Sequence, residues 1–232
     1  MKKGLIGLLP EVLSQLDAFD DSTPAKTRAT TPSLSPVKRA LNMAAVTSIK
    51  EPQTGTTFPS SKPSADGSKT DTLIGVGCRI KNIMFMNMKI LSAGMYIDVE
   101  AAAPLLKPYV GKSLAALQAD QSLFDVLIKG PFRKSMIITF AMGLTKAQLS
   151  DGYVEDLKPR LPSAKKHLCQ IFTKKMTDVR THDTITVNIS PEGLVDSIFN
   201  GEPTNNPLTV LLVSFLSSYP PSVPLWHTLP KQ

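Results

Sequence analysis

A long apolar segment at residues 73–98, with the sequence LIGVGCRIKNIMFMNMKILSAGMYID, constrains the fold of this chain more than any other feature. Its apolar residues flank a polar position at Asn87, so we predict a β-hairpin with arms at 79–84 and 89–97. We place the turn near Asn87, because asparagine tolerates the left-handed backbone of a tight turn. Gly94 falls inside the second arm, where a glycine indicates a bulge or the close approach of another segment.

Arg79 stands at the head of this hairpin. A guanidinium that enters an apolar surface must either reach water or contact an anion, because an unpaired buried charge is costly. Arg79 is therefore the first candidate for a functional residue. It is either the anchor of an anionic ligand or one member of a structural ion pair.

The remaining pattern predicts short helices and further strands. The expected helices lie at 101–110, 113–118, 121–129 and 145–157, and the expected strands lie at 134–142, at 183–189 and in a segment ending near 199. Thr145 and Gln148 have the spacing of a helix-capping box. Because strands and helices are clustered and do not alternate strictly, we predict an α+β fold in which an antiparallel β-sheet packs against a layer of α-helices.

The first 50 residues differ in composition from the rest of the chain. Residues 22–50 contain no acidic residue and are rich in Ser, Thr, Pro, Lys and Arg, which is typical of a transit peptide, and residues 1–16 predict a short amphipathic helix. We expect residues 1–50 to be a disordered leader or a transit peptide, and residues 51–232 to form one domain. Translation from Met43 is an alternative. The expected compartment is a plastid or another organelle if the leader is a transit peptide, and the cytoplasm otherwise.

Charge and residue spacing argue against several kinds of site. The net charge of +7 is spread thinly, without the clustering expected of a nucleic-acid-binding surface. Cys78 and Cys169 are far apart, and His167, His182 and His227 share no metal-ligand spacing, so we predict no metal and no cofactor. No apolar run reaches the length of a membrane span. We expect a monomer whose partner is a small ligand.

Five short motifs in a fixed order resemble the chalcone isomerase family. They are Gly75-x-Gly77-x-Arg79, Gly94-Met95-Tyr96, Lys112-Ser113, Phe124-Asp125-Val126 with Gly130-Pro131-Phe132, and Leu144-Thr145. The resemblance covers residues 51–201 and implies the open-faced sandwich of that family. It does not fix the function, because the family contains isomerases, fatty-acid-binding proteins and non-catalytic helpers.

The resemblance also implies where the isomerase residues would fall. In the family's enzymes, a phenolate adds to an unsaturated ketone between an arginine and a threonine of the hairpin and a Tyr…Asn pair of the following helix. Arg79 matches the arginine, whereas the threonine position falls on Leu91, with Ser92 beside it. The tyrosine and asparagine positions fall on Leu149 and Asp156. Two hydroxyls are therefore replaced by leucine, and Asp156 would place a negative charge where the phenolate binds.

We therefore predict a non-catalytic protein that binds a fatty acid or a similar apolar carboxylate. Arg79 would be the anion anchor, because a guanidinium offers two parallel hydrogen bonds to a carboxylate and the family's fatty-acid-binding members use this arginine. Leu91, Met95 and Leu149 would line the cleft. Three alternatives remain open. They are a structural Arg79–Asp156 pair, an intramolecular lyase acting on a chalcone or related polyphenol, and a non-catalytic helper that binds a partner protein.

Overall fold

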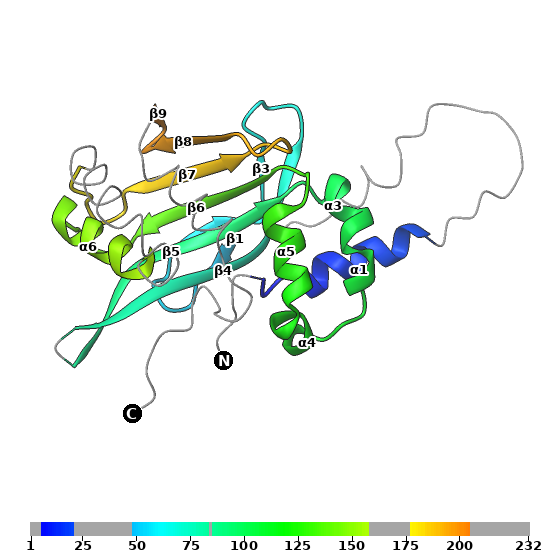
Figure 1. The fold of residues 1–232 in the computed structure, drawn as a ribbon, viewed down its shortest axis with the longest axis horizontal. Helices are drawn as coiled ribbons and strands as arrows, with labels where there is room; N and C mark the ends of the chain where they lie inside the picture. The colour runs from blue at the N-terminus through cyan, green and yellow to red at the C-terminus, as the bar shows by residue number, and fades with distance from the viewer. Residues whose placement is uncertain (1–5, 21–47, 84, 158–176, 205–232) are drawn as a thin grey trace, which may run out of the picture.

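Antiparallel strands that follow one another in the sequence form the central sheet. The computed structural model describes residues 6–20, 48–83, 85–157 and 177–204. Within them, seven strands pair in the order β3-β4-β5-β6-β7-β8-β9 (Figure 1). Their bounds are β3 (Ser61–Pro63), β4 (Thr70–Ile83), β5 (Met86–Ile97), β6 (Lys134–Phe140), β7 (Thr184–Ile189), β8 (Val195–Phe199) and β9 (Glu202–Thr204). The antiparallel sheet predicted from the sequence is thereby confirmed.

Helices join β5 to β6 and follow β6. They are α3 (Val99–Leu106), the 3-10 turn η1 (Lys107–Tyr109), α4 (Leu114–Ala119), α5 (Gln121–Lys129) and α6 (Lys146–Leu157). Side chains at Asp98, Ser113 and Asp120 accept hydrogen bonds from the first turns of α3, α4 and α5, which satisfies backbone donors that a helix start leaves unpaired. No described helix is both long and apolar enough to cross a bilayer. The combination of these helices with the antiparallel sheet confirms the predicted α+β class.

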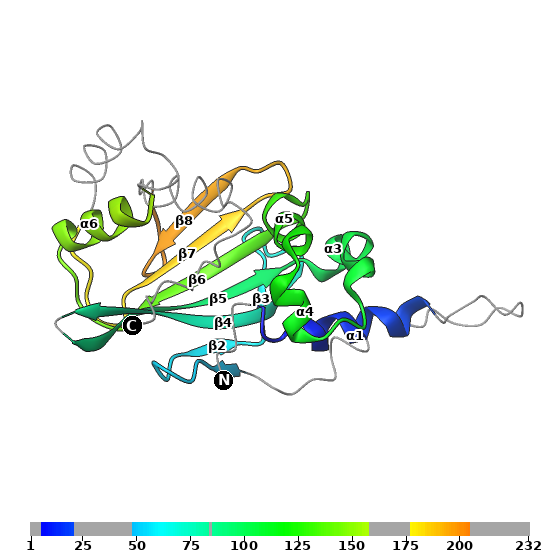
Figure 2. The ribbon, with the colours of Figure 1, turned by 60° about the horizontal axis from the view of Figure 1, so that its bottom comes forward.

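The two faces of the sheet carry separate hydrophobic clusters. Leu91 and Met95 of β5 belong to the larger cluster, which includes the buried residues of α3, α4 and α5. Tyr96 belongs to a second cluster with Phe58, on the side of a small sheet made of β1 (Ser48–Lys50) and β2 (Thr57–Pro59) (Figure 2). Alternate residues of a strand point to opposite faces, so these memberships identify the helix face and the β1–β2 face of β5.

The β4–β5 hairpin is longer than predicted, and its turn lies earlier in the sequence. Ile83 pairs with Met86, so the turn lies between these two residues and includes Phe85, and Asn87 pairs with Asn82 inside the ladder. The predicted turn near Asn87 is therefore wrong. The left-handed backbone falls on Phe85, with φ of 67°. Asn87 has a regular strand position because the hydrogen-bonded register continues past it.

Helix α1 (Leu9–Asp20) packs into the larger cluster. Leu9 and Leu13 are fully buried, and the backbone N–H of Leu8 donates to the carbonyl of Ile74 in β4 (3.0 Å). This corrects the expectation that residues 1–50 lie outside the fold, since residues 6–16 are part of the core and Ser48–Lys50 forms a strand. The long-range packing of α1 could not be deduced from its local composition. Residues 21–47 and 205–232, which that expectation also covers, lie outside the described residues.

Candidate functional site

Arg79 and Leu91 face each other across the β4–β5 ladder. Directly opposed side chains of an antiparallel pair point to the same face of the sheet. Leu91 is buried in the larger cluster, and its partner on β6 is the buried Phe140. The half-buried Arg79 therefore lies on the helix face, at the margin of an apolar surface.

Two further predicted residues lie on that face. Met95 lies four residues after Leu91 on β5, so its side chain points to the same face of the sheet. Both residues are buried in the cluster that also contains Leu149 of α6. The structure thus brings Leu91, Met95 and Leu149 into one cluster on the face occupied by Arg79. The side chain of Asp156 lies outside the described residues, so the Arg79–Asp156 pair stays a hypothesis.

The predicted capping box fixes the start of α6 and with it the position of Leu149. The Thr145 N–H donates to Gln148 Oε1 (2.9 Å), and the Gln148 N–H donates to Thr145 Oγ1 (3.3 Å). The Lys146 N–H donates to Asp178 Oδ1 (2.8 Å), which ties the helix to the segment before β7. Leu149 therefore enters the core from the first turn of a well-anchored helix.

Ser92 lies on the opposite face of the sheet. Ser92 pairs with Cys78 of β4 and lies two residues before Gly94, so positions 92 and 94 face the same side of the sheet. A β-carbon at position 94 would meet Phe58 and Leu73 of the second cluster. The Ser92 side chain is buried, and its Oγ makes no hydrogen bond to the described residues. Ser92 is thus separated by the sheet from the face that carries Arg79, and the geometry gives it no part in a site there.

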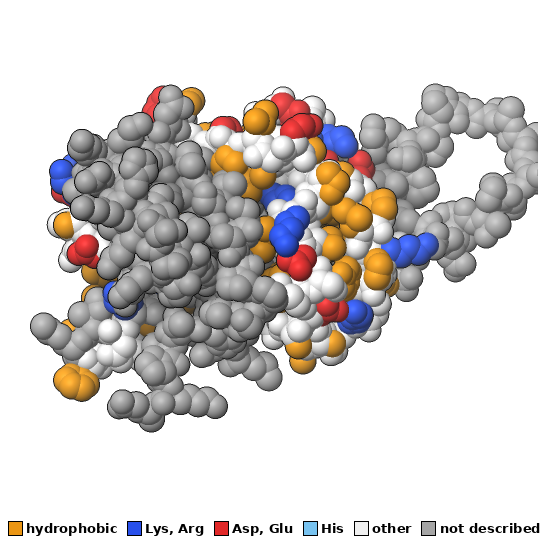
Figure 3. All heavy atoms as spheres, viewed as in Figure 1, with side chains coloured by type: hydrophobic (Ala, Val, Ile, Leu, Met, Phe, Trp, Pro, Cys, Tyr) orange, Lys and Arg blue, Asp and Glu red, His pale blue; other side chains and the backbone are white. Residues whose placement is uncertain are grey.

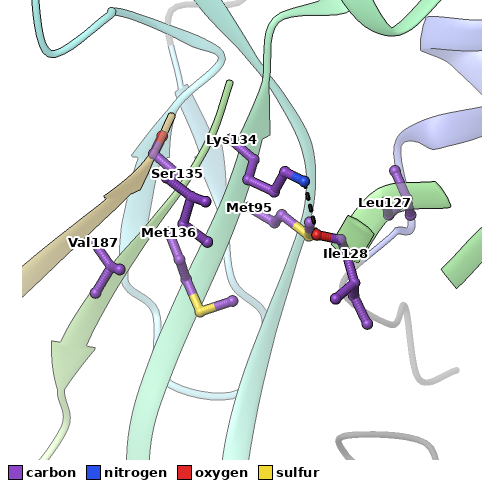
Figure 4. A pocket seen from close by; sticks show the side chains of 8 residues that line it. Met95, Leu127, Ile128, Lys134, Ser135, Met136 and Val187 are labelled. Carbon is purple, nitrogen blue, oxygen red and sulfur yellow. Dashed lines mark hydrogen bonds between the residues drawn. The ribbon is translucent and has the colours of Figure 1, made fainter. Parts of the chain in front are cut away.

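A small cavity opens on the helix face beside Met95 (Figure 4). It is lined by Met95, Leu127, Ile128, Lys134, Ser135, Met136, Val187 and Ile189. Its volume is about 20 Å³, which accommodates one water molecule but not an acyl chain. A larger ligand on this part of the face would require packed side chains such as Met95 and Met136 to move apart.

Lys134 contributes a buried cation that the sequence analysis missed. Its Nζ donates to the carbonyls of Ile128 and Gly130 (2.8 Å each), at the C-terminal end of α5, and lies 4.6 Å from the centre of the Phe132 ring. Burial of the ammonium lowers the pKa of Lys134 to about 8. The sequence feature that could have indicated this buried cation is a lysine at the start of a largely apolar strand. Its hydrogen bonds to helix carbonyls indicate a capping role.

The fold is similar to that of a solved structure, the fatty-acid-binding protein of Arabidopsis thaliana. The two structures align with a TM-score of 0.57 over 74% of this chain and 88% of that chain, at 23% sequence identity. At this identity the likeness establishes the fold alone.

Curated relatives are plant proteins named chalcone–flavanone isomerase. The protein of Oryza sativa subsp. japonica is 32% identical over 115 residues, which cover 49% of this chain and 48% of the relative. The protein of Ipomoea batatas is 25% identical over 180 residues, which cover 69% of this chain and 74% of the relative. The match to the rice protein thus spans about half the length of that relative.

The family model described as chalcone-flavanone isomerase matches residues 54–170, just over half of the chain. This range contains the β4–β5 hairpin, the helices α3 to α6 and strand β6. These elements include Arg79, Leu91, Met95 and Leu149. The chain belongs to the chalcone isomerase family.

Proposed function

We propose that this protein binds a fatty acid or a similar apolar carboxylate on the helix face of its sheet, with Arg79 as the anion anchor. The observation that carries the proposal is the position of Arg79 opposite Leu91, at the margin of a continuous apolar surface. A guanidinium keeps its charge at any physiological pH and offers a forked pair of donors that fits a carboxylate.

The residues around this position suit an apolar tail. Leu91, Met95 and Leu149 carry no hydrogen-bonding hydroxyl, and Met95 and Met136 line the small cavity farther along the face. Methionine side chains are unbranched and adapt readily to an inserted group. We infer that an acyl chain enters by displacing these side chains. The description of the Arabidopsis thaliana structure as a fatty-acid-binding protein supports this proposal.

A second candidate is an intramolecular lyase that acts on a chalcone. It is supported by the names of the rice and Ipomoea batatas relatives and by the presence of Arg79, which could polarise the substrate carbonyl. Leu91 and Leu149 weigh against it, because both are buried apolar side chains at positions where the family's enzymes carry hydroxyls. Ligand binding without turnover therefore fits this site better.

Native mass spectrometry of the purified full-length protein tests the proposal. We expect the parent protein and an Arg180→Ala control, which removes an exposed arginine on a turn, to carry acyl chains. The Arg79→Ala variant should be empty. If all three proteins are empty, the binding proposal is overturned, and chalcone turnover above the spontaneous rate becomes the decisive assay for the lyase.

Titration of delipidated protein with palmitate gives the second readout. The loss of a charge-assisted hydrogen-bonded pair should weaken binding by about tenfold to a hundredfold in Arg79→Ala. The Arg180→Ala control should bind like the parent. Equal affinity of Arg79→Ala and the parent would show that Arg79 is not the anchor.

A further inference from the structure

The β4–β5 hairpin ends in two exposed apolar side chains, Phe85 and Met86, which we call the hairpin tip. Phe85 is 100% exposed and Met86 is 60% exposed. The hairpin extends past the neighbouring strands of the sheet, so the tip projects from this end of the sheet (Figures 1 and 2). The space-filling view shows apolar side chains gathered at that end (Figure 3). Most of the surface of these two side chains is therefore in contact with water.

The backbone at the tip is also strained. Phe85 has φ of 67°, a left-handed conformation that bulky residues rarely adopt. The connection between the paired residues Ile83 and Met86 is two residues long, a loop length for which Asn-Gly or Asp-Gly is the usual choice. Phe85 therefore has both an unfavourable backbone and an exposed ring, and no packing contact with the described residues offsets either. Strain that the fold does not need indicates a function for the side chain.

The hairpin around the tip is basic. Residues 72–97 contain no Asp or Glu but include Arg79, Lys81 and Lys89. Lys89 is exposed, and its Nζ donates to the carbonyl of Gln53. Lys81 lies four residues before Phe85, so its Cα is roughly 13 Å from that of Phe85 along the strand. The apolar hairpin tip is thus followed, along both strands, by the positively charged side chains of Lys81 and Lys89.

We propose that the hairpin tip docks on an anionic phospholipid bilayer. Phe85 and Met86 enter the boundary between head groups and acyl chains, and Lys81 and Lys89 lie at the level of the anionic head groups. Interfacial segments insert roughly 5–10 Å, which places lysines about 13 Å behind the tip in the head-group layer. This function goes beyond ligand binding and does not depend on it.

The size of the tip favours a bilayer over a partner protein. A stable protein interface buries about 800 Å² on each partner, and two side chains at the end of a narrow hairpin cannot supply that area. A bilayer requires only an apolar insertion and nearby cations, because its surface is continuous and its charge is supplied by many head groups.

Flotation of the full-length protein with vesicles tests this proposal. The vesicles are made of phosphatidylcholine alone or of equal parts phosphatidylcholine and phosphatidylglycerol. We expect the parent and a Leu194→Ser control, which removes a 72% exposed apolar side chain from the β7–β8 turn, to float with the anionic vesicles. The double variant Phe85→Ser/Met86→Ser should bind at least tenfold more weakly. Added salt should also weaken the binding of the parent.

Two outcomes would overturn the proposal. One is a parent protein that does not float with anionic vesicles, and the other is a double variant that floats as well as the parent. The double variant should keep the unfolding midpoint of the parent or raise it, because the Phe85 side chain is fully exposed within the part of the chain that the structure describes. Loss of binding in a stable variant is therefore a direct effect on docking.

A tryptophan reporter locates the inserted position. In a Trp226→Phe background, which removes the single native tryptophan, Phe85→Trp should be quenched by brominated lipid in anionic vesicles. Leu194→Trp in the same background should not be quenched. Equal quenching at the two positions, or none at position 85, would contradict the proposed orientation.

Discussion

Gly94 of β5 lies so close to Phe58 of β2 that a β-carbon on Gly94 would be 2.7 Å from Phe58 Cδ1. A contact that short is not tolerated, so Gly94→Ala must push the ring or the strand aside. We expect the substitution to lower the free energy of unfolding by about 1–3 kcal/mol. Urea denaturation followed by circular dichroism measures the change.

Gly152→Ala provides the matched control for Gly94→Ala. Gly152 lies in α6, and a β-carbon there meets no atom within 4 Å. Alanine at an open helical position should raise stability by about 0.5–1 kcal/mol. If Gly94→Ala is as well tolerated as Gly152→Ala, the close approach of Phe58 is not a constraint in solution.

The packing of α1 predicts that the N-terminal residues stabilise the domain. Leu13 is fully buried in the larger cluster, so Leu13→Ala should lower the free energy of unfolding by about 2–5 kcal/mol. Glu11→Ala, on the exposed side of the same helix, should change it by less than about 0.5 kcal/mol. Equal stability of the two variants would show that α1 is not part of the core. The same denaturation assay decides between them.

Arg133 joins two buried carboxylates. Its Nη2 lies 3.3 Å from Asp71 Oδ1 and 3.0 Å from Asp98 Oδ2. Arg133→Met leaves Asp71 with its contact to Lys62 (3.6 Å), and it leaves Asp98 with its contact to Lys69 (3.5 Å) and its hydrogen bond from the Ala101 N–H (3.1 Å). We expect a loss of roughly 2–3 kcal/mol in the free energy of unfolding, below the full cost of an uncompensated buried charge.

The control for Arg133 is an exposed ion pair. Lys129 and Asp125 lie one helical turn apart with their charged atoms at 3.0 Å, and both side chains are exposed. Lys129→Met should cost less than about 0.5 kcal/mol, because water and salt screen such pairs. If Arg133→Met lowers the free energy of unfolding no more than Lys129→Met does, the arginine stabilises the two carboxylates only weakly.

The low pKa of Lys134 predicts a pH-dependent stability. Burial lowers its pKa from 10.5 to about 8, so between these values the unfolded chain holds more protons than the folded one. Stability should therefore rise with pH, by about 1 kcal/mol between pH 8 and 9 from this group. Above pH 9 the partly buried Cys78 thiol, whose pKa is raised to about 11, acts in the opposite direction.

The comparison of variants isolates the contribution of Lys134. Lys134→Met should remove the rise between pH 8 and 9, whereas Lys129→Met, on an exposed lysine of α5, should retain it. Unfolding midpoints in urea at several pH values provide the measurement. The same slope in Lys134→Met and in the parent would assign the pH dependence to another group.

Local patterns in the sequence were sufficient to predict the secondary structure around the site. The capping box at Thr145 and Gln148 and the buried strand at β6 depend on residues close in the chain, and both are present. The position of the hairpin turn was predicted incorrectly, since the rule that favours asparagine for a left-handed backbone does not anticipate Phe85.

The candidate site was predictable only in part. Strand parity places Leu91 and Met95 on one face and Ser92 on the other, and this alternation is visible in the sequence once the strand is known. The placement of Lys134 against the end of α5 depends on how two elements pack, which no local pattern encodes.

The order in which the chain is synthesised gives α1 a particular disadvantage. Its buried face contacts β4, α3 and η1, and the last of these ends at Tyr109. At about 5–20 residues per second, the leucines of α1 leave the ribosome on the order of 5–20 s before their binding surface is complete. Until η1 has been made, the apolar face of α1 has only part of its binding surface, so it stays partly exposed on the nascent chain. Each described strand of the central sheet after β3, by contrast, pairs with the strand made just before it.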